Sequence, residues 1–270
     1  MKSVHHHGCN GAPERRSPVW LWTLCVAACL AGCVSTAQRN PLAQWRASPN
    51  HDVRSAQLIV LHQTEMSSAS AALLTLQTRN TGGRVSAHYL IGDDGRLYQL
   101  VDESQRAWHA GASRWAGLAD LNSSSIGIEL DNDGQSEFSS AQIDTLLRLL
   151  TDLTTRLGIA PHLVVAHGDI APARKRDPGV LFPWGRLADA GFGLWPRATL
   201  AAPPPGLDRW AALRLIGYDL RDPAAALRAF HRHFRASESP AWEAGDEEIL
   251  HDLQLQLMAL PIPSLDGNGP

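Results

Sequence analysis

The chain has 270 residues, of which 44% are hydrophobic and 19% carry a charge, and its formal net charge is −3 at pH 7. This composition is ordinary for a globular protein, so it argues against wholesale disorder and against a polytopic membrane protein. A mildly acidic chain is also a poor candidate for binding nucleic acid, because such binding depends on basic side chains that neutralise phosphates. The length allows one good-sized domain and a smaller second one.

The N-terminal segment has the three parts of a secretory signal. Arg15 and Arg16 precede an apolar run over residues 19–30, and the run ends in Leu-Ala-Gly-Cys. The run is too short for a comfortable membrane-spanning helix, which needs about 20 residues. Its ending resembles the bacterial lipobox, in which the cysteine receives a lipid and becomes the first residue of the mature protein. We therefore expect a lipoprotein signal peptide over residues 1–32 and a lipid anchor at Cys33.

Two further observations concern this anchor. Val-Ala-Ala-Cys, ending at Cys29, is an alternative lipobox that would leave a shorter apolar core. Val34 follows Cys33, and by resemblance to enteric sorting rules this residue indicates the outer membrane, with the protein on its periplasmic face. All four cysteines lie within the first 33 residues. The rest of the chain can therefore form no disulfide, and a metal site in it must use His, Asp or Glu.

The next part of the chain predicts a tether followed by buried strands. Residues 33–52 are polar and read as the tether. Residues 57–62 are apolar on both faces, as in a central strand, and end in His62. Residues 67–78 show helical spacing. Two short apolar runs, at 88–91 and 97–100, flank a Gly-Asp-Asp-Gly turn and predict a hairpin.

A strand and helix pattern continues towards residue 167. Residues 126–130 form a further strand that contains Glu129. Ser139 and Gln142 make a capping-box pattern ahead of an amphipathic helix that Gly158 stops. Residues 163–166 are another buried strand, and His167 follows it. These elements predict an α/β fold, with a mixed β-sheet flanked by helices.

A proline-rich segment over residues 199–207 breaks every periodic pattern and is expected to be a stiff linker. Beyond it, three helical patterns cover residues 210–216, 224–234 and 247–260. They predict a small C-terminal all-α module over residues 208–262. The larger first domain is expected to occupy residues 53–198.

Three side chains form a candidate metal site. His62 and His167 directly follow buried strands, where a sheet of this kind presents its functional groups. Asp177 follows in Arg-Lys-Arg-Asp-Pro-Gly. Two imidazoles and one carboxylate are sufficient for a catalytic zinc ion, because a fourth position stays open for water.

Six segments occur in the order of the motifs of a known family. They are Ile-Val-Leu-His-Gln-Thr at 59–64, Val-Ser-Ala-His-Tyr-Leu-Ile at 85–91, Arg-Ala-Trp-His-Ala-Gly at 106–111, Ser-Ile-Gly-Ile-Glu at 125–129, Ala-His-Gly-Asp-Ile at 166–170 and Arg-Lys-Arg-Asp-Pro-Gly at 174–179. The chain thus resembles the type-2 N-acetylmuramoyl-L-alanine amidases, over residues 58–184. This family also includes bacteriophage lysozyme-type amidases and animal peptidoglycan recognition proteins.

The resemblance implies roles for individual residues. His62, His167 and Asp177 would hold Zn²⁺, Glu129 would be the general base, and Lys175 would face the developing oxyanion. His88 and His109 match family positions near the cleft, where they would bind substrate or orient a ligand. Ala87 departs from the phage pattern, which has tyrosine at this position, so the phage set of accessory groups is not expected.

The implied function is hydrolysis of the amide between N-acetylmuramic acid and L-alanine in peptidoglycan or its fragments. The C-terminal helices resemble a three-helix peptidoglycan-binding module. With the lipid anchor, this combination is most similar to the outer-membrane lipoprotein amidases of Gram-negative bacteria. The expected partners are peptidoglycan, muropeptides and, through the anchor, a membrane, and the protein is expected to be a monomer. A non-catalytic peptidoglycan receptor and a stem-peptide metallopeptidase on the same fold are the alternatives.

Overall fold

The computed structural model describes residues 39–53, 56–80 and 83–261. The predicted signal peptide, Cys33 and the first residues of the predicted tether lie outside these ranges. Within them, none of the helices combines the length and the apolar character that crossing a membrane requires.

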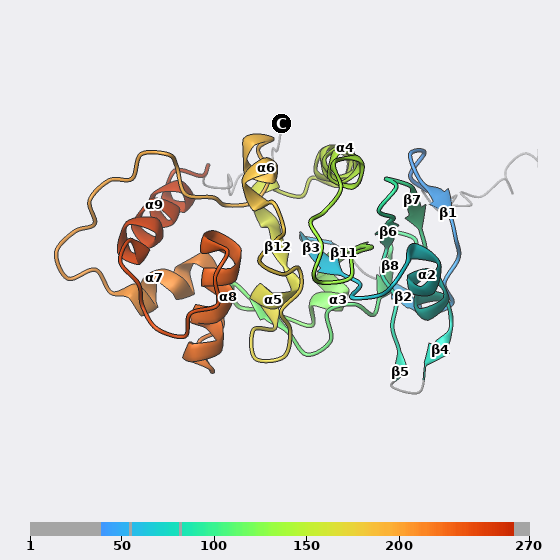
Figure 1. Ribbon diagram of the computed structural model, residues 1–270, viewed down its shortest axis with the longest axis horizontal. Helices are drawn as coiled ribbons and strands as arrows, with labels where there is room; N and C mark the ends of the chain where they lie inside the picture. Colours follow the sequence, from blue (N-terminus) through green and yellow to red (C-terminus); the bar gives the residue numbers. More distant parts are fainter. Residues whose placement is uncertain (1–38, 54–55, 81–82, 262–270) are drawn as a thin grey trace, which may run out of the picture. The chain divides into compact units, whose positions relative to one another are not determined.

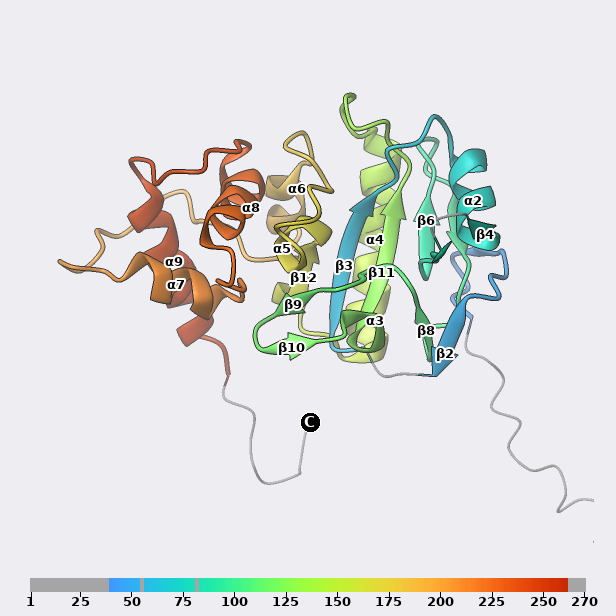
Figure 2. The same cartoon turned by 90° about the horizontal axis from the view of Figure 1, so that it is seen from below.

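A six-stranded sheet lies at the centre of the fold, with strand order β1-β7-β6-β11-β3-β12. Its strands are β1 (Gln44–Trp45), β7 (Leu97–Gln99), β6 (Tyr89–Ile91), β11 (Ser125–Leu130), β3 (Leu58–Gln63) and β12 (Val164–Ala166). β6 and β7 form an antiparallel hairpin, whereas every other neighbouring pair is parallel. The prediction of a mixed sheet is therefore confirmed. Figure 2 shows β3 and β11 side by side against α4 (Ser140–Leu157).

Alternate residues of the central strands belong to two different cores. Ile59 and Leu61 of β3 pack with α4 in one core. Leu58 and Val60 belong to a second core, which also contains residues of the C-terminal helices. Those helices are α7 (Arg209–Ile216), α8 (Pro223–Arg235) and α9 (Asp246–Met258). Because side chains alternate between the faces of a sheet, α4 lies on one side of β3 and the second core on the other.

The remaining elements are short, apart from α2. α2 (Ala69–Gln77) packs through Ala72 and Leu76 against the β6–β7 hairpin in a third core. The small strands are β2 (His51–Val53), β4 (Arg79–Asn80), β5 (Gly83–Arg84), β8 (Gln105–Ala107), β9 (Arg114–Trp115) and β10 (Leu118–Ala119). The short helices are α3 (Leu121–Ser124), η1 (Pro161–Leu163), α5 (His167–Ile170) and α6 (Trp184–Asp189).

The tether prediction is wrong for the described residues from 39 onward. β1 pairs with β7 at the edge of the main sheet, and β2 pairs with β8. The buried Asn40 donates from its backbone to Gln99 Oε1 and from its side chain to Asp152 Oδ2. These contacts use backbone groups, two side-chain amides and a carboxylate rather than an apolar face. Hydrophobic periodicity therefore could not reveal them.

The predicted capping box is only half formed. Ser139 caps α4, because its hydroxyl accepts a hydrogen bond from the Gln142 backbone. The Gln142 side chain does not return to Ser139. It is fully buried, and its amide donates to the carbonyls of Ile91, the last residue of β6, and of Asp131, the residue after β11. Because the side chain is buried, its NH₂ group satisfies two strand-end carbonyls, and its oxygen does not accept from the Ser139 backbone as a capping box requires.

The C-terminal helices share a core with the sheet. Ala226, Phe230 and Leu253 are fully or almost fully buried in the core that contains Leu58 and Val60. Residues 199–207 contain no helix or strand, as a linker should. Figures 1 and 2 both show α8 next to α5. The helices beyond the linker therefore pack as part of the catalytic fold, although the proline-rich sequence suggested a separate module.

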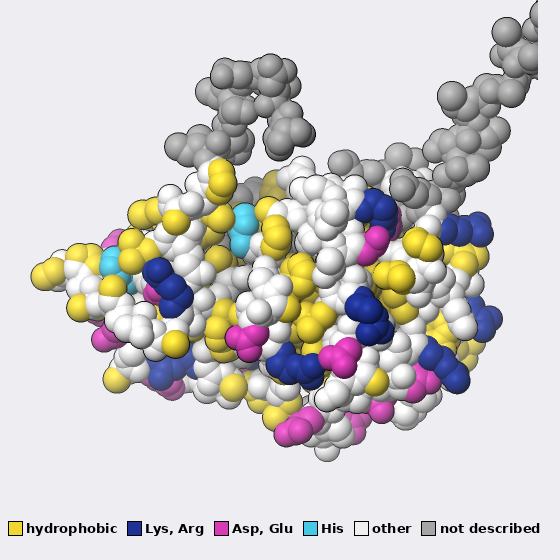
Figure 3. All heavy atoms as spheres, turned by 90° about the horizontal axis from the view of Figure 1, so that it is seen from above, with side chains coloured by type: hydrophobic (Ala, Val, Ile, Leu, Met, Phe, Trp, Pro, Cys, Tyr) yellow, Lys and Arg dark blue, Asp and Glu magenta, His cyan; other side chains and the backbone are white. Residues whose placement is uncertain are grey.

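One face of the surface is shown in Figure 3. Lys and Arg side chains are interspersed there with Asp and Glu, and hydrophobic side chains show between them. On this face, the coloured residues form no continuous patch of one charge.

Candidate active site

Three polar side chains stand in one row at the carboxyl ends of the central strands. Glu129 of β11 lies directly opposite His62 of β3. β12 ends at Ala166, which lies opposite Leu61, so His167 follows at the level of His62. Strand register alone therefore brings together residues that are far apart in the sequence.

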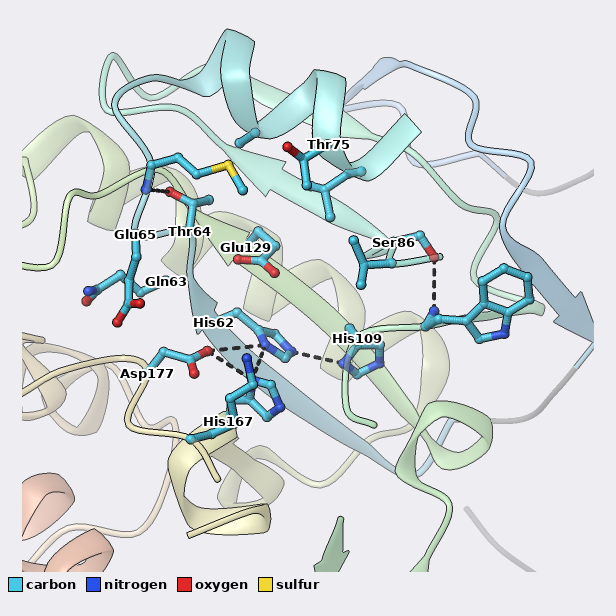
Figure 4. Close-up of a pocket in the computed structure, with 16 residues that line it drawn as sticks. His62, Gln63, Thr64, Glu65, Thr75, Ser86, His109, Glu129, His167 and Asp177 are labelled. Carbon is cyan, nitrogen blue, oxygen red and sulfur yellow. Dashed lines mark hydrogen bonds and ion pairs between the residues drawn. The ribbon is translucent and has the colours of Figure 1, made fainter. Parts of the chain in front are cut away.

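Asp177 joins this row from the segment after α5. The Gly168 backbone donates a 2.7 Å hydrogen bond to the Asp177 carbonyl, which fixes the two segments together. Asp177 Oδ2 lies 3.0 Å from His167 Nδ1 and 3.4 Å from His62 Nδ1. The two Nδ1 atoms are 2.9 Å apart. All three side chains are buried, and Figure 4 shows them converging.

The other ring nitrogens fix the tautomers of these histidines. His167 Nε2 lies 3.3 Å from the carbonyl of Ala110, which can only accept, so Nε2 carries the proton. Ser125 donates its hydroxyl proton to the Leu121 carbonyl and therefore accepts from His109 Nε2 at 3.3 Å. His109 Nδ1 then accepts from His62 Nε2 at 2.9 Å. Both facing Nδ1 atoms are therefore left with lone pairs.

This arrangement fits a cation. Two imidazole lone pairs and a carboxylate oxygen repel one another at about 3 Å unless a positive charge lies between them. Tetrahedral zinc with Zn–N bonds of about 2.0–2.1 Å would hold its ligand atoms about 3.3 Å apart. The observed separations of 2.9, 3.0 and 3.4 Å are close to that value. Among the residues that the structure describes, His62, His167 and Asp177 thus form the group that could bind one metal ion.

The surroundings shift the pKa values of His62 and Asp177. Burial, followed by the neighbouring His167, lowers the pKa of His62 to about 4, against the opposing effect of Asp177. Burial would raise the pKa of Asp177, but hydrogen bonds with His167 and His62 outweigh it and hold that pKa below its usual range. Both shifts favour the deprotonated forms of these two side chains, which are the forms that bind metals.

Glu129 and Lys175 line the same pocket as the three candidate ligands. Glu129 Oε2 is buried and accepts no hydrogen bond from the described residues. Burial raises the pKa of Glu129 to about 8, the charge of Asp177 acts in the same direction, and Lys175 opposes it. Figure 4 shows Glu129 beside His62, on the pocket side of the sheet.

The two histidines of uncertain role are placed very differently. His109 lines the pocket and bonds to His62, so it stands where an orienting residue would. His88 is completely buried. Its Nδ1 accepts from the Gly127 backbone, and its Nε2 donates to the Gln105 carbonyl. The expectation that His88 binds substrate is therefore wrong, because both ring nitrogens are used inside the fold.

The comparisons with known proteins agree with this geometry. Residues 52–180 match the family model described as N-acetylmuramoyl-L-alanine amidase. The chain is 36% identical to the N-acetylmuramoyl-L-alanine amidase AmiD of Escherichia coli over 252 residues, which cover 80% of this chain and 90% of AmiD. The chain belongs to the N-acetylmuramoyl-L-alanine amidase family. The resemblance seen in the sequence is thereby confirmed.

Solved structures of this family extend the likeness to the whole described fold. A complex of E. coli AmiD with the substrate anhydro-N-acetylmuramic acid-L-Ala-D-gamma-Glu-L-Lys superimposes with a TM-score of 0.66 at 34% identity, and covers 81% of this chain and 93% of AmiD. AMPDH3 from Pseudomonas aeruginosa gives a TM-score of 0.68 at 32% identity, and covers 82% of this chain and 99% of AMPDH3. Both matches cover more than four fifths of this chain, which supports the fold prediction.

Sequence reasoning missed three residues that shape the site. Asn122 Oδ1 accepts hydrogen bonds from the backbones of His109 and Ala110. Ser125 completes the chain of donors that begins at His62. Asp169 caps α5 next to His167. Asp169 and Ser125 both lie in motifs quoted above, whereas Asn122 lies in none of them.

Proposed function

We propose that this chain is a zinc-dependent amidase that hydrolyses the bond between N-acetylmuramic acid and L-alanine in peptidoglycan or its fragments. One observation supports this function above the others. A buried carboxylate oxygen of Glu129, without a partner among the described residues, lines the pocket that His62, His167 and Asp177 share. Unpaired buried carboxylates are costly and gather where chemistry needs them. The AmiD complex named above contains a substrate of this class.

In this proposal the Nδ1 atoms of His62 and His167 and the Oδ2 atom of Asp177 face one another and would hold the metal. A zinc ion held there would supply Lewis-acid chemistry, which lowers the pKa of a water towards about 7 and polarises an amide carbonyl. His109 accepts from His62 Nε2 and so keeps the His62 ring in the orientation that binding requires.

Glu129 and Lys175 supply the proton transfer and the electrostatic stabilisation. Glu129 takes a proton from the attacking water and passes it to the leaving nitrogen of L-alanine. Burial raises its pKa to about 8 in the metal-free protein, and a cation held beside it would favour the carboxylate form that accepts the proton. Lys175 stabilises the negative charge that develops on the carbonyl oxygen.

Mass spectrometry of purified muropeptides tests this function. Wild type and Glu129→Gln are incubated with the same muropeptide, and the masses of the products are measured. We expect wild type to release free stem peptide with an intact sugar, and Glu129→Gln to lose at least about 100-fold in rate while still binding about one zinc ion per chain. If wild type cleaves another bond of the stem peptide, it is a peptidase. If wild type binds the muropeptide and does not cleave it, it is a receptor.

We also propose that the protein is a lipoprotein of the outer membrane, anchored through Cys33. The support is the Leu-Ala-Gly-Cys sequence after a short apolar run. Labelled palmitate should be incorporated into wild type and not into Cys33→Ser, and the label should fractionate with outer membranes. Incorporation that persists in Cys33→Ser and disappears in Cys29→Ser would favour the alternative lipobox.

The C-terminal helices are proposed to contribute to peptidoglycan binding as well as to the fold. Their resemblance to a three-helix wall-binding module supports this role. Sedimentation with purified sacculi measures it, using Glu129→Gln so that the polymer is not degraded. Exposed Trp210 is a suitable position to change, since Trp210→Ala should weaken sedimentation if this surface binds glycan.

A further inference from the structure

We propose that the C-terminal helices are a positioning element for the metal site: they hold the two segments that carry His167, Lys175 and Asp177, and so set the affinity of the site for zinc. This inference rests on the proposed function, because it takes those residues as the zinc site. The supporting side chains lie late in the chain, on α8 and after α7. They do not line the pocket and do not contact the three candidate metal ligands.

The first segment, α5, cannot hold itself in place. It has four residues and begins with His167. A helix of this length is unstable in isolation, because too few hydrogen bonds form for the residues that it fixes. Its position must therefore come from contacts with other elements.

Asp169 supplies these contacts from within α5. The side chain is 1% exposed. Its Oδ2 accepts from the Ala166 backbone at 2.9 Å and from His233 Nδ1 at 2.6 Å, and its Oδ1 accepts from the Tyr218 hydroxyl at 2.8 Å. Two of the three donors thus belong to the C-terminal region. Charge-assisted hydrogen bonds of this kind are stronger than neutral ones.

The rings of these donors are themselves fixed. His233 stacks on Trp184 with a centroid distance of 3.7 Å, and Phe234 lies against it at 4.2 Å. Tyr218 packs edge-on against Trp115 at 4.9 Å. Neither donor can therefore follow α5 if α5 moves. Gly168 adds a close approach, because a Cβ on it would lie 2.9 Å from an Arg232 nitrogen.

The second segment is held through Glu238, which follows α8. Glu238 accepts hydrogen bonds from Arg232 and from Arg176. Arg176 stands between Lys175 and Asp177 in the sequence. One carboxylate therefore joins α8 to the segment that carries the third ligand and the proposed oxyanion group. The hydrogen bond from Gly168 to the Asp177 carbonyl connects this segment to α5.

The two connections have a common consequence. His62 and Glu129 are placed by strand register, which the backbone ladder of the sheet maintains. His167 and Asp177 lie beyond the sheet, and their spacing relative to His62 depends on α5 and on the segment after it. A metal site must hold its ligands to within about 0.5 Å. Loosening α5 should therefore weaken metal binding before it unfolds the protein.

Matched substitutions in the full-length protein test the proposal. Tyr218→Phe removes only the hydroxyl that reaches Asp169. Tyr89→Phe is the control, because Tyr89 also donates to a buried carboxylate, that of Glu103, but at a distance in the fold from α5. His233→Phe keeps a stacking ring and removes the donor. Its control is His231→Phe, on the same helix, since His231 pairs with the equally buried Asp246 of α9.

The readouts are the zinc dissociation constant, measured by competition with a chromophoric chelator, and the visible spectrum of the cobalt-substituted protein. We expect Tyr218→Phe and His233→Phe to raise the zinc dissociation constant about 10-fold, the lower end of the usual effect of residues that support ligands, and to alter the cobalt spectrum. The two controls should stay within about twofold of wild type, even where they lower the melting temperature as much.

Two results would overturn the proposal in different ways. If wild type binds zinc and Tyr218→Phe matches Tyr89→Phe in both readouts, the C-terminal helices do not position the site, and the proposed function still stands. If wild type binds no zinc at all, the proposed function fails and this inference fails with it. His233→Phe is not needed for the decision, so a failure of that variant to fold leaves the test intact.

Discussion

Gly127 of β11 is the position where adding a single carbon should disturb the site most. A Cβ placed on it would lie 2.4, 2.6 and 2.7 Å from the Cγ, Nδ1 and Cδ2 atoms of His109. Ordinary van der Waals contact begins at 3.4 Å. Gly127→Ala therefore requires the His109 ring to move by about 1 Å, since the strand is held in its ladder on both sides.

That movement has a cost in stability and a cost in metal binding. Overpacking a close-packed interior typically costs about 1–3 kcal/mol. The His109 ring also lies 2.9 Å from His62 Nε2, so a shift of this size breaks that hydrogen bond and adds about 1 kcal/mol. We expect Gly127→Ala to lose about 2–4 kcal/mol of the free energy of unfolding. Because His109 orients a proposed ligand, the zinc dissociation constant should also rise about 10-fold.

Urea unfolding followed by tryptophan fluorescence measures the first effect, and chelator competition measures the second. Gly185→Ala is the matched control. Gly185 lies in α6, and a Cβ on it would meet nothing closer than 4.0 Å, from Trp195. Alanine in a helix is favoured over glycine by about 0.5–1 kcal/mol, so this variant should equal or exceed wild type. If Gly127→Ala unfolds within 0.5 kcal/mol of wild type (roughly the error of such measurements), the packing of His109 against β11 has been misjudged.

Three further predictions concern other buried polar groups. Gln142→Ala should cost about 2–3 kcal/mol, because it removes a buried donor from the Asp131 carbonyl and one of the two donors of the Ile91 carbonyl, whereas removing the cap in Ser139→Ala should cost only about 1 kcal/mol; equal losses in urea unfolding would contradict the assignment. His88→Phe should lower the melting temperature but leave kcat within about threefold of wild type, since His88 bonds to backbone groups and not to substrate. A loss of kcat without a loss of stability would show that His88 acts in the active site. In the metal-free protein, the raised pKa of Glu129 means that its stabilising contribution is complete below about pH 4.5 and is lost as pH rises towards about 8. The stability of wild type relative to Glu129→Gln should therefore fall by a few kcal/mol across that range, and a flat difference would show that Glu129 is solvated.

Much of the central architecture could be predicted from the sequence, because it depends on patterns that the chain displays locally. The apolar runs that became β3, β11 and β12 are buried on both faces, so they need no partner to be recognised. A histidine or glutamate that interrupts or ends such a run stands out against it. The candidate ligands His62 and His167 could be predicted from this pattern. The family resemblance supplied the main support for Asp177 as the third ligand.

The errors have a different physical origin. β1 and β2 are two- and three-residue strands whose pairing uses backbone groups, and backbone hydrogen bonds leave no trace in side-chain pattern. His88 was assigned to the cleft because its motif lies near the cleft, although the segment that leads into β6 places the ring in the interior. Gln142 fits a capping pattern, but its burial was invisible in the sequence. In each case the deciding contact is tertiary.

The same distinction divides the proposed active site itself. Glu129 and His62 are neighbours across two paired strands, so their separation is set by the sheet and should tolerate changes elsewhere. His167 and Asp177 lie beyond the end of β12, where local backbone hydrogen bonds, such as the one from Gly168 to Asp177, and side-chain contacts from Asp169, Arg176 and the C-terminal helices hold the backbone. One half of the site is therefore fixed by the sheet and the other half by contacts with neighbouring elements. Substitutions on α8 that lie outside the pocket should still lower the affinity of the site for metal. Those same substitutions should leave the Glu129–His62 pairing unchanged, because the ladder between β11 and β3 does not depend on them.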